Sequence, residues 1–305
     1  MKDITCLVTG ATSGLGYAMA SQLAKTGATV VMMARDKSRG QKARVKLIKE
    51  SHNPNIDLVE GDLASLDSIK NFVKTFKRNY YELNVLANCA GIQTPKRRVS
   101  VDGYELNFAT NILGPFVLTE LLLDFMLESG RASIINVSGE AHRIGHIHFN
   151  DLELKKKISL KEAKGQTALA RVMWTFELSR RLARTNVTAN TFSPGKTRTS
   201  IHKHYPLPLR WLKKAEYKLF GKSSNERVKP VVDFVLEEGL YGASGKYLEQ
   251  GKVATSIPLS CHRGLNKRLW RTCERMTGLD GYAAQVIGKR TYYKPSIDDG
   301  LSAAY

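Results

Sequence analysis

Cysteine is scarce in this sequence, and no arrangement of its cysteines is typical of a metal site. The 305 residues contain four, at Cys6, Cys89, Cys261 and Cys273. None of them pairs with another at the short spacing of a zinc ligand set, and they fall in different predicted elements. We therefore expect no metal and no disulfide, and free thiols are typical of a reducing compartment.

The sequence also has no long uninterrupted run of hydrophobic residues. Its first predicted strand begins at Ile4, which leaves no room for the basic and apolar regions of a signal peptide. No apolar run approaches the length that spans a bilayer. With 42% hydrophobic and 25% charged residues, we expect a soluble, cytoplasmic protein with a sizeable core.

Acidic residues are few beside the basic ones, since 28 Asp and Glu against 47 Lys and Arg give a formal charge of +19. Nucleic acid, an anionic membrane surface or an anionic ligand would each fit this excess. No nucleic-acid motif accompanies it, so we expect no nucleic-acid partner. The densest basic stretch, 208–222, is interpreted as part of a substrate lid over about 200–225 with a solvated charged face. The alternative is an amphipathic helix that makes peripheral contact with a membrane.

Short runs rich in valine and isoleucine alternate with helical stretches along most of the chain. The predicted strands are 4–8, 29–33, 56–59, 85–87, 133–137, 187–192 and 245–248, and the helices between them are 16–26, 37–51, 65–78, 102–127, 160–183 and 225–238. This alternation predicts an α/β fold, a doubly wound parallel sheet (Rossmann fold). Short connections leave no domain boundary within 1–258. A basic helix at 263–276 and a tail without clear periodicity, within 259–305, are expected to pack on the same single domain.

A glycine-rich loop, Thr9-Gly-Ala-Thr-Ser-Gly-Leu-Gly16, joins the first predicted strand to the first helix. Glycine is needed there for a sharp turn, for close approach of the backbone to a pyrophosphate, and for packing of the helix on the strand. The N–H groups and dipole at the helix start favour a diphosphate. The predicted contacts are Gly10, Thr12, Ser13, Gly14, Leu15 and Gly16.

The end of the second predicted strand indicates which dinucleotide is bound. Ala34 stands where an NAD-selective site usually offers a carboxylate to the ribose 2′-hydroxyl, and Arg35 follows it. A carboxylate would repel a 2′-phosphate, whereas a guanidinium binds one. We therefore predict NADP(H) as the cofactor.

These features resemble the short-chain dehydrogenase/reductase (SDR) family, from Thr9 to about Gly278. Further segments match its patterns: the pair that contacts adenine, the Asn-Asn-Ala-Gly segment with Cys89 in place of its second asparagine, the helix asparagine Asn111, and the turn that holds the nicotinamide amide. The resemblance implies further cofactor contacts at Asp62, Leu63, Asn88, Ala90, Gly91, Pro194, Gly195, Thr197 and Thr199.

Three segments, 135–142, 149–152 and 268–278, are similar to the retinol dehydrogenase branch of that family. The resemblance implies a lipophilic small-molecule ligand, a carbonyl compound or an alcohol such as a retinoid or steroid. It also implies a homo-oligomer built from two long helices per subunit, one of them 160–183.

The Ser-Tyr-Lys catalytic residues of that branch are missing from the aligned positions. An alignment without gaps places Gly139 at the serine, Lys164 at the tyrosine and Ala168 at the lysine. A change of register does not restore them, because no tyrosine lies between Tyr104 and Tyr205 and none in the chain is followed four residues later by lysine. The tyrosine normally transfers a proton to or from the substrate oxygen, which accelerates such reactions roughly 10²- to 10⁴-fold.

Three hypotheses follow from this loss. The fold serves non-redox chemistry such as isomerisation, elimination or cyclisation; or it remains a reductase with a substitute acid; or it is a pseudoenzyme that senses NADPH or a lipid. The candidate catalytic residues are Asn111, Lys164, Ser138 and His142. Lys164 can equally be a solvated residue at a helix start and His142 a brace for its loop, and Ser138 is expected to point to the opposite side of its strand.

Overall fold

The computed structural model describes residues 4–156, 159–195, 197 and 223–291. The predicted contact Thr199, the basic stretch 208–222 and most of the predicted lid lie outside the described residues.

Eight strands form one sheet, in the order β3-β2-β1-β4-β5-β6-β7-β8. The strands are β1 Thr5–Thr9, β2 Thr29–Ala34, β3 Ile56–Glu60, β4 Val85–Asn88, β5 Ala132–Val137, β6 Val187–Ser193, β7 Tyr247–Glu249 and β8 Lys252–Ala254. Strands β1 to β7 pair in parallel, and β8, which the sequence did not predict, pairs antiparallel with β7. The prediction of a single-domain, doubly wound α/β fold is confirmed.

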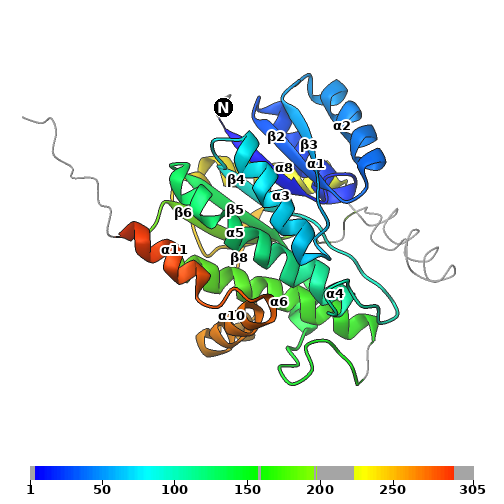
Figure 1. Cartoon of the computed structure of the whole chain (residues 1–305), viewed down its shortest axis with the longest axis vertical. Coiled ribbons are helices and arrows are strands. Elements are labelled where there is room, and N and C mark those ends of the chain that lie inside the picture. Colours follow the sequence, from blue (N-terminus) through cyan, green and yellow to red (C-terminus); the bar gives the residue numbers. More distant parts are fainter. Residues whose placement is uncertain (1–3, 157–158, 196, 198–222, 292–305) are drawn as a thin grey trace, which may run out of the picture.

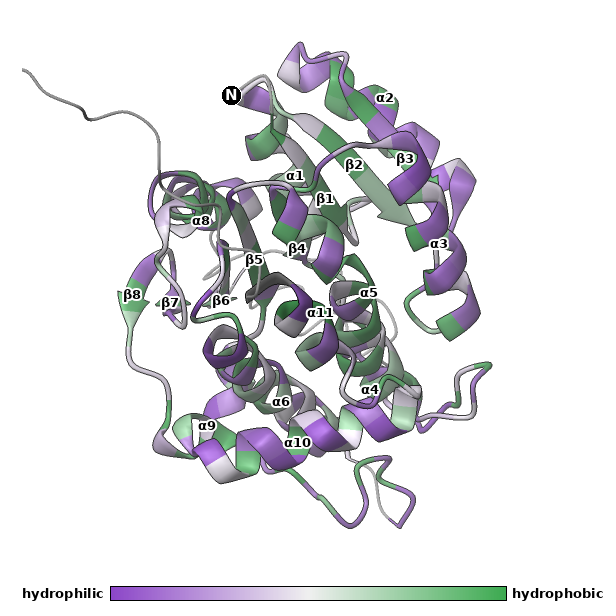
Figure 2. Ribbon diagram, turned by 60° about the vertical axis from the view of Figure 1, so that its left-hand side comes forward, coloured by the Kyte–Doolittle hydropathy of each residue, from purple (hydrophilic) through white to green (hydrophobic). Residues whose placement is uncertain are grey.

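Helices cover both faces of the sheet (Figure 1). One face carries α1 Gly14–Lys25, α2 Lys37–Ser51 and α8 Ser224–Glu237, and the other carries α3 Leu66–Asn79, α5 Gly114–Glu128 and α6 Leu160–Arg181. Side chains alternate between the faces: Cys6 and Val8 of β1 pack toward α1 and α8, and Leu7 packs toward α3 and α5. Figure 2 shows the inner strands as largely hydrophobic and the outer surface of α10 as hydrophilic.

Side-chain caps explain why several of these helices begin where they do. The Asp36 carboxylate accepts a hydrogen bond from the Arg39 N–H at 2.9 Å at the start of α2. Ser65 caps α3 in the same way, and Ser159 and Ser223 form capping boxes with glutamates three residues on. Each such cap stabilises a helix by about 1 kcal/mol.

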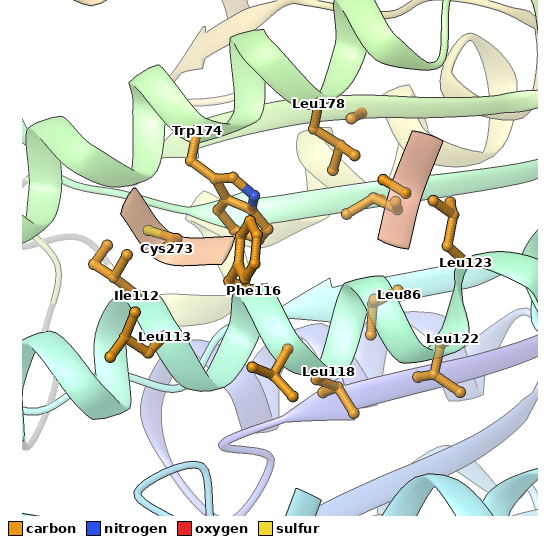
Figure 3. Packing of buried hydrophobic residues seen from close by; sticks show 14 of the residues in the cluster. Leu86, Ile112, Leu113, Phe116, Leu118, Leu122, Leu123, Trp174, Leu178 and Cys273 are labelled. Atoms are coloured by element: carbon orange, nitrogen blue, oxygen red, sulfur yellow. The ribbon is translucent and has the colours of Figure 1, made fainter. Parts of the chain in front are cut away.

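The C-terminal helices pack on the face formed by α5 and α6. They are α9 Pro258–Cys261, α10 Arg263–Thr277 and α11 Tyr282–Thr291, so the tail expected to lack periodicity begins as a helix. Trp270 of α10 is fully buried, with its ring centroid 5.0 Å from that of Phe116. Figure 3 shows Cys273 of the same helix near Phe116 and Trp174, inside one hydrophobic cluster.

The helix predicted at 102–127 has three parts: α4 Leu106–Phe108, a π-helical turn η1 Ala109–Leu113, and α5. Within the described residues it is the one helix long and apolar enough to cross a bilayer, judged by length and composition alone, which corrects the expectation that no apolar run approaches that length. Its most apolar window is 72% buried inside the protein. This burial is the behaviour of a core helix.

Candidate functional site

The candidate site lies at the carboxyl ends of the parallel strands, where the strand order reverses between β1 and β4. Two adjoining hollows meet there and share Leu15 and the segment 89–92 as lining. We call the first, which follows the glycine loop toward β2 and β3, the cofactor cleft. We call the second, beside β5 and α6, the inner cleft.

Two glycines of the loop lie so close to neighbouring backbone atoms that a side chain would not fit. A β-carbon at Gly10, where φ is +67°, would lie 2.8 Å from the Ala90 Cα, and one at Gly16 would lie 2.3 Å from the Gly10 carbonyl oxygen. Ser13, the N-cap of α1, makes no side-chain capping bond, unlike the caps of α2 and α3. The N–H groups of the first turn therefore face the cleft without a side-chain acceptor, which fits a diphosphate.

The predicted loop contacts all line the cofactor cleft. Sequence reasoning missed Thr9, which also lines it. The Thr9 hydroxyl accepts hydrogen bonds from the N–H groups of Cys89 and Ala90, both at 3.1 Å. This hydroxyl ties the end of β1 to the loop after β4, so the two walls of the cleft are held at a fixed separation.

The far end of the cofactor cleft is lined by Ala34, Arg35, Asp36 and Arg39, with Asp62 and Leu63 opposite. Arg39 was not predicted, although it lies four residues after Arg35, in the first turn of α2, and lines the same end of the cleft. The Asp36 carboxylate is engaged as the cap of α2. Two exposed guanidinium groups therefore stand where the sequence predicted one.

The inner cleft brings together the three positions aligned with the missing catalytic residues. Lys164 and Ala168 lie one turn apart on α6, and both line the cleft with Gly139. A β-carbon at Gly139 would have no neighbour within 4 Å, so the structure leaves space there for a larger side chain. None of the described residues that line this cleft is a tyrosine.

Ser138 also lines the inner cleft, which contradicts the expectation that it points away. Its hydroxyl donates a hydrogen bond to the Ala168 carbonyl at 2.8 Å. Alternation along β5 explains this placement, because Asn136, two residues earlier, faces α6 and donates to the Thr175 hydroxyl at 2.9 Å. Gly139 lies beyond the end of the strand, where side chains no longer alternate strictly between the two faces. The direction of Ser138 therefore could not be inferred from the position of Gly139.

Asn111 sits in the π-helical turn and lines the inner cleft. Its side chain accepts a hydrogen bond from the Ile92 N–H at 2.8 Å and donates one to the Ile92 carbonyl at 2.9 Å. The side chain therefore braces the loop after β4. The backbone carbonyl of Asn111 accepts hydrogen bonds from Arg171, and π-helical turns often mark functional sites.

Arg171, which the sequence analysis did not single out, closes the floor of the inner cleft. It is buried, yet its guanidinium donates to the carbonyls of Asn88 and Val137, each at 3.0 Å, as well as to Asn111. Burial lowers its pKa to about 10, so it stays charged at neutral pH. Its position seven residues after Lys164, two turns along one helix face, was the signal available in the sequence.

Pro194, Gly195 and Thr197, for which the resemblance implied cofactor contacts, line the inner cleft, and so do Ala90 and Gly91. Asn88 does not line either cleft: its amide donates to the Asn136 side chain at 2.9 Å and to the Thr119 hydroxyl at 3.2 Å. Its carbonyl supports Arg171 instead.

His142 is not brought to either cleft. Its ring is buried, with Nδ1 2.9 Å from the Gly139 carbonyl and the ring centroid 5.0 Å from that of Tyr247. Burial lowers its pKa, which disfavours the charged form. The geometry is that of a brace for the turn after β5. No group of three or more metal-ligating side chains occurs within the part of the chain that the structure describes.

Comparisons with known proteins agree with this geometry. The family model described as short chain dehydrogenase matches residues 5–151. Human polyprenol dehydrogenase is 34% identical over 284 residues, which cover 91% of this chain and 86% of that protein. Human retinol dehydrogenase 13 is 34% identical over 288 residues, covering 90% and 85%.

Among solved structures, an uncharacterised protein from Mycobacterium paratuberculosis has a TM-score of 0.68 at 28% identity, covering 90% of this chain and 94% of that chain. The chain belongs to the short-chain dehydrogenase/reductase family and to its retinol-dehydrogenase-like branch, as its motifs predicted. This is an oxidoreductase family that binds nicotinamide cofactors.

Proposed function

We propose that this chain is an NADPH-dependent reductase of a lipophilic carbonyl compound, in which Lys164 is the proton donor in place of tyrosine. The observation that carries the proposal is one continuous depression with a phosphate-binding loop toward one end and Lys164 at the other. Polyprenol and retinol appear in the names of two relatives, and a lipophilic substrate for this chain is proposed by analogy with them.

The preference for NADP(H) over NAD(H) rests on Ala34, Arg35 and Arg39. β2 ends at Ala34 without a carboxylate, the Asp36 carboxylate just beyond it is engaged as the cap of α2, and two guanidinium groups line the same end of the cleft. Arg35→Ala should therefore weaken NADPH binding roughly 10- to 100-fold, the usual loss for a charge-assisted hydrogen bond. NADH lacks the 2′-phosphate, so its affinity should hardly change. Equal losses for both would contradict the assignment.

The bound cofactor would supply the hydride, and the residues of this chain would do the rest. The first turn of α1 would hold the diphosphate, Arg35 and Arg39 the 2′-phosphate. Lys164 would hold a proton at Nζ and transfer it to the substrate oxygen. Ser138 is committed to the Ala168 carbonyl and can accept a hydrogen bond from a ligand in the inner cleft, since a hydroxyl has two lone pairs.

The test is titration of the pure protein with NADPH and NADH, followed by turnover with lipophilic aldehydes and ketones. NADPH consumption should fall roughly 10²- to 10⁴-fold in Lys164→Ala, the usual contribution of a general acid. Lys161→Ala is the matched control, because Lys161 is exposed on the same helix and does not line the cleft. An unchanged rate in Lys164→Ala would remove the proposed acid.

The second candidate is non-redox chemistry, such as isomerisation, elimination or cyclisation of the same class of ligand. It is favoured by Gly139 and Ala168, which offer no polar side chain at two aligned catalytic positions. NADPH binding without consumption, together with a mass-neutral or dehydrated product, would support it. Binding without any product would support the ligand-sensing hypothesis.

The proposal extends to a cytoplasmic location, with the basic stretch 208–222 as either substrate lid or peripheral membrane contact, and to a homo-oligomer. In the described part of the chain, α10 packs on α6 and α11 on α5 (Figure 1). A homo-oligomer on this face would therefore form across α10 and α11. Size-exclusion chromatography with light scattering tests the oligomer.

A further inference from the structure

We infer that Arg171 sets the redox preference of the site, making the protein bind NADPH more tightly than NADP+. This inference rests on the proposed binding of NADP(H). It concerns the affinity of the two cofactor forms and is independent of any substrate or proton donor.

The Arg171 guanidinium is fixed in place by its hydrogen bonds. Three of its acceptors come from separate segments: Asn88 ends β4, Val137 ends β5, and Asn111 lies in η1. A weaker contact reaches the Ala90 carbonyl at 3.4 Å. Only 3% of Arg171 is exposed, so the group has no room to turn toward solvent.

Among the described residues, the Arg171 charge has no close counter-ion. All its acceptors are neutral carbonyls, and the adjacent Cys89 thiol is uncharged because burial raises its pKa to about 12. Of the described residues that line the inner cleft, Glu140 alone carries a carboxylate, and it is exposed to solvent screening. The floor of the inner cleft is therefore electropositive.

The lining of the two clefts sets the orientation of the proposed dinucleotide. Arg35 and Arg39 place the 2′-phosphate, and with it the adenosine, toward β2 and β3. The diphosphate belongs at the start of α1, so the other half of the molecule must continue past Leu15 and Ala90 into the inner cleft. The nicotinamide end is thus the part that meets the potential of Arg171.

The consequence follows from the charge of the ring, which is positive in NADP+ and neutral in NADPH. A fixed cation raises the free energy of the oxidised form and leaves the reduced form unaffected. If the ring lay on the order of 6 to 10 Å from the guanidinium, a unit charge at an effective dielectric constant of about 20 would change the affinity ratio roughly 10- to 100-fold. The protein would then select NADPH from a mixed pool and release NADP+.

The experiment measures Kd for NADPH and NADP+ by calorimetry in wild type, Arg171→Lys and Arg171→Met. Both variants lose hydrogen bonds to the same carbonyls, but only the second loses the charge. The ratio of the two Kd values cancels contributions from the phosphates and from any general loosening of the fold. We expect at least about a tenfold preference for NADPH in wild type and Arg171→Lys, and its loss in Arg171→Met.

Each alternative outcome is decisive. Equal affinity for both forms in wild type would overturn the inference without any variant, which matters if a variant does not fold. The same preference in all three proteins would also overturn it. No binding of either form to wild type would overturn the proposed function and this inference together, a pattern distinct from binding without preference.

Discussion

Glu120 offers the sharpest prediction about stability, because a carboxyl group is fully buried in the middle of α5. Burial and the nearby carboxyl of Glu274 raise its pKa from 4.5 to about 8, against the opposing effects of Arg181 and the Ala283 N–H. In the unfolded chain the same group titrates near its usual value. The folded protein therefore holds a proton between about pH 4.5 and 8 that the unfolded chain has lost.

The sign of the effect follows from this difference in bound protons. Because the folded state binds more protons, the free energy of unfolding falls as pH rises through this window, and the loss is complete above about pH 8. This difference in pKa corresponds to about 5 kcal/mol at full effect.

The perturbation is Glu120→Gln, which keeps the shape and removes the charge. Urea unfolding at pH 5, 7 and 9 gives the free energy of unfolding of both proteins. As pH rises, the variant should become more stable relative to wild type, by several kcal/mol at pH 9. Asp124→Asn is the control, since Asp124 lies one turn along α5, is half-exposed and pairs with Lys77 at the surface. It should change stability by less than about 1 kcal/mol. Parallel pH profiles for wild type and Glu120→Gln would refute the reasoning.

Three further outcomes are expected. Gly145→Ala should lower the free energy of unfolding by roughly 3 kcal/mol in urea titrations, because its β-carbon would lie 2.2 Å from the Gly165 carbonyl oxygen; a neutral effect would contradict this packing. Mass spectrometry after brief alkylation of the native protein should find Cys261 modified first, since it is the exposed one of the four thiols. Lys164→Tyr combined with Ala168→Lys should create or raise NADPH-dependent reductase activity, and continued inertness would argue against a functional nicotinamide geometry.

The parts of this fold that sequence predicted well depend on local pattern. The strands and the glycine loop were found because apolar runs and glycine spacing are readable over a few residues. The role of Arg35 stays a prediction, and the structure shows only that it lines the cofactor cleft. β8 was missed because three residues carry little pattern, and α11 because its periodicity is weak.

The inner cleft was harder to predict because its groups are assembled from distant segments. The carbonyls that accept hydrogen bonds from Arg171 lie 34 to 83 positions away in the chain. No short stretch of sequence contains them together with Arg171. The direction of Ser138 depended on where β5 ends, and strand ends are the least readable feature of a sequence. Sequence reasoning therefore located the site and left its floor undescribed.

The burial of Trp270 has a consequence for how the protein is made. Its ring completes the aromatic packing around Phe116, yet α10 is synthesised after every strand of the sheet. A chain still emerging from the ribosome, or one truncated before α10, leaves large apolar side chains of α5 and α6 uncovered, the kind of surface that chaperones and proteases recognise. The apolar surface of α5 and α6 is therefore covered once α10 has been made and packs against it.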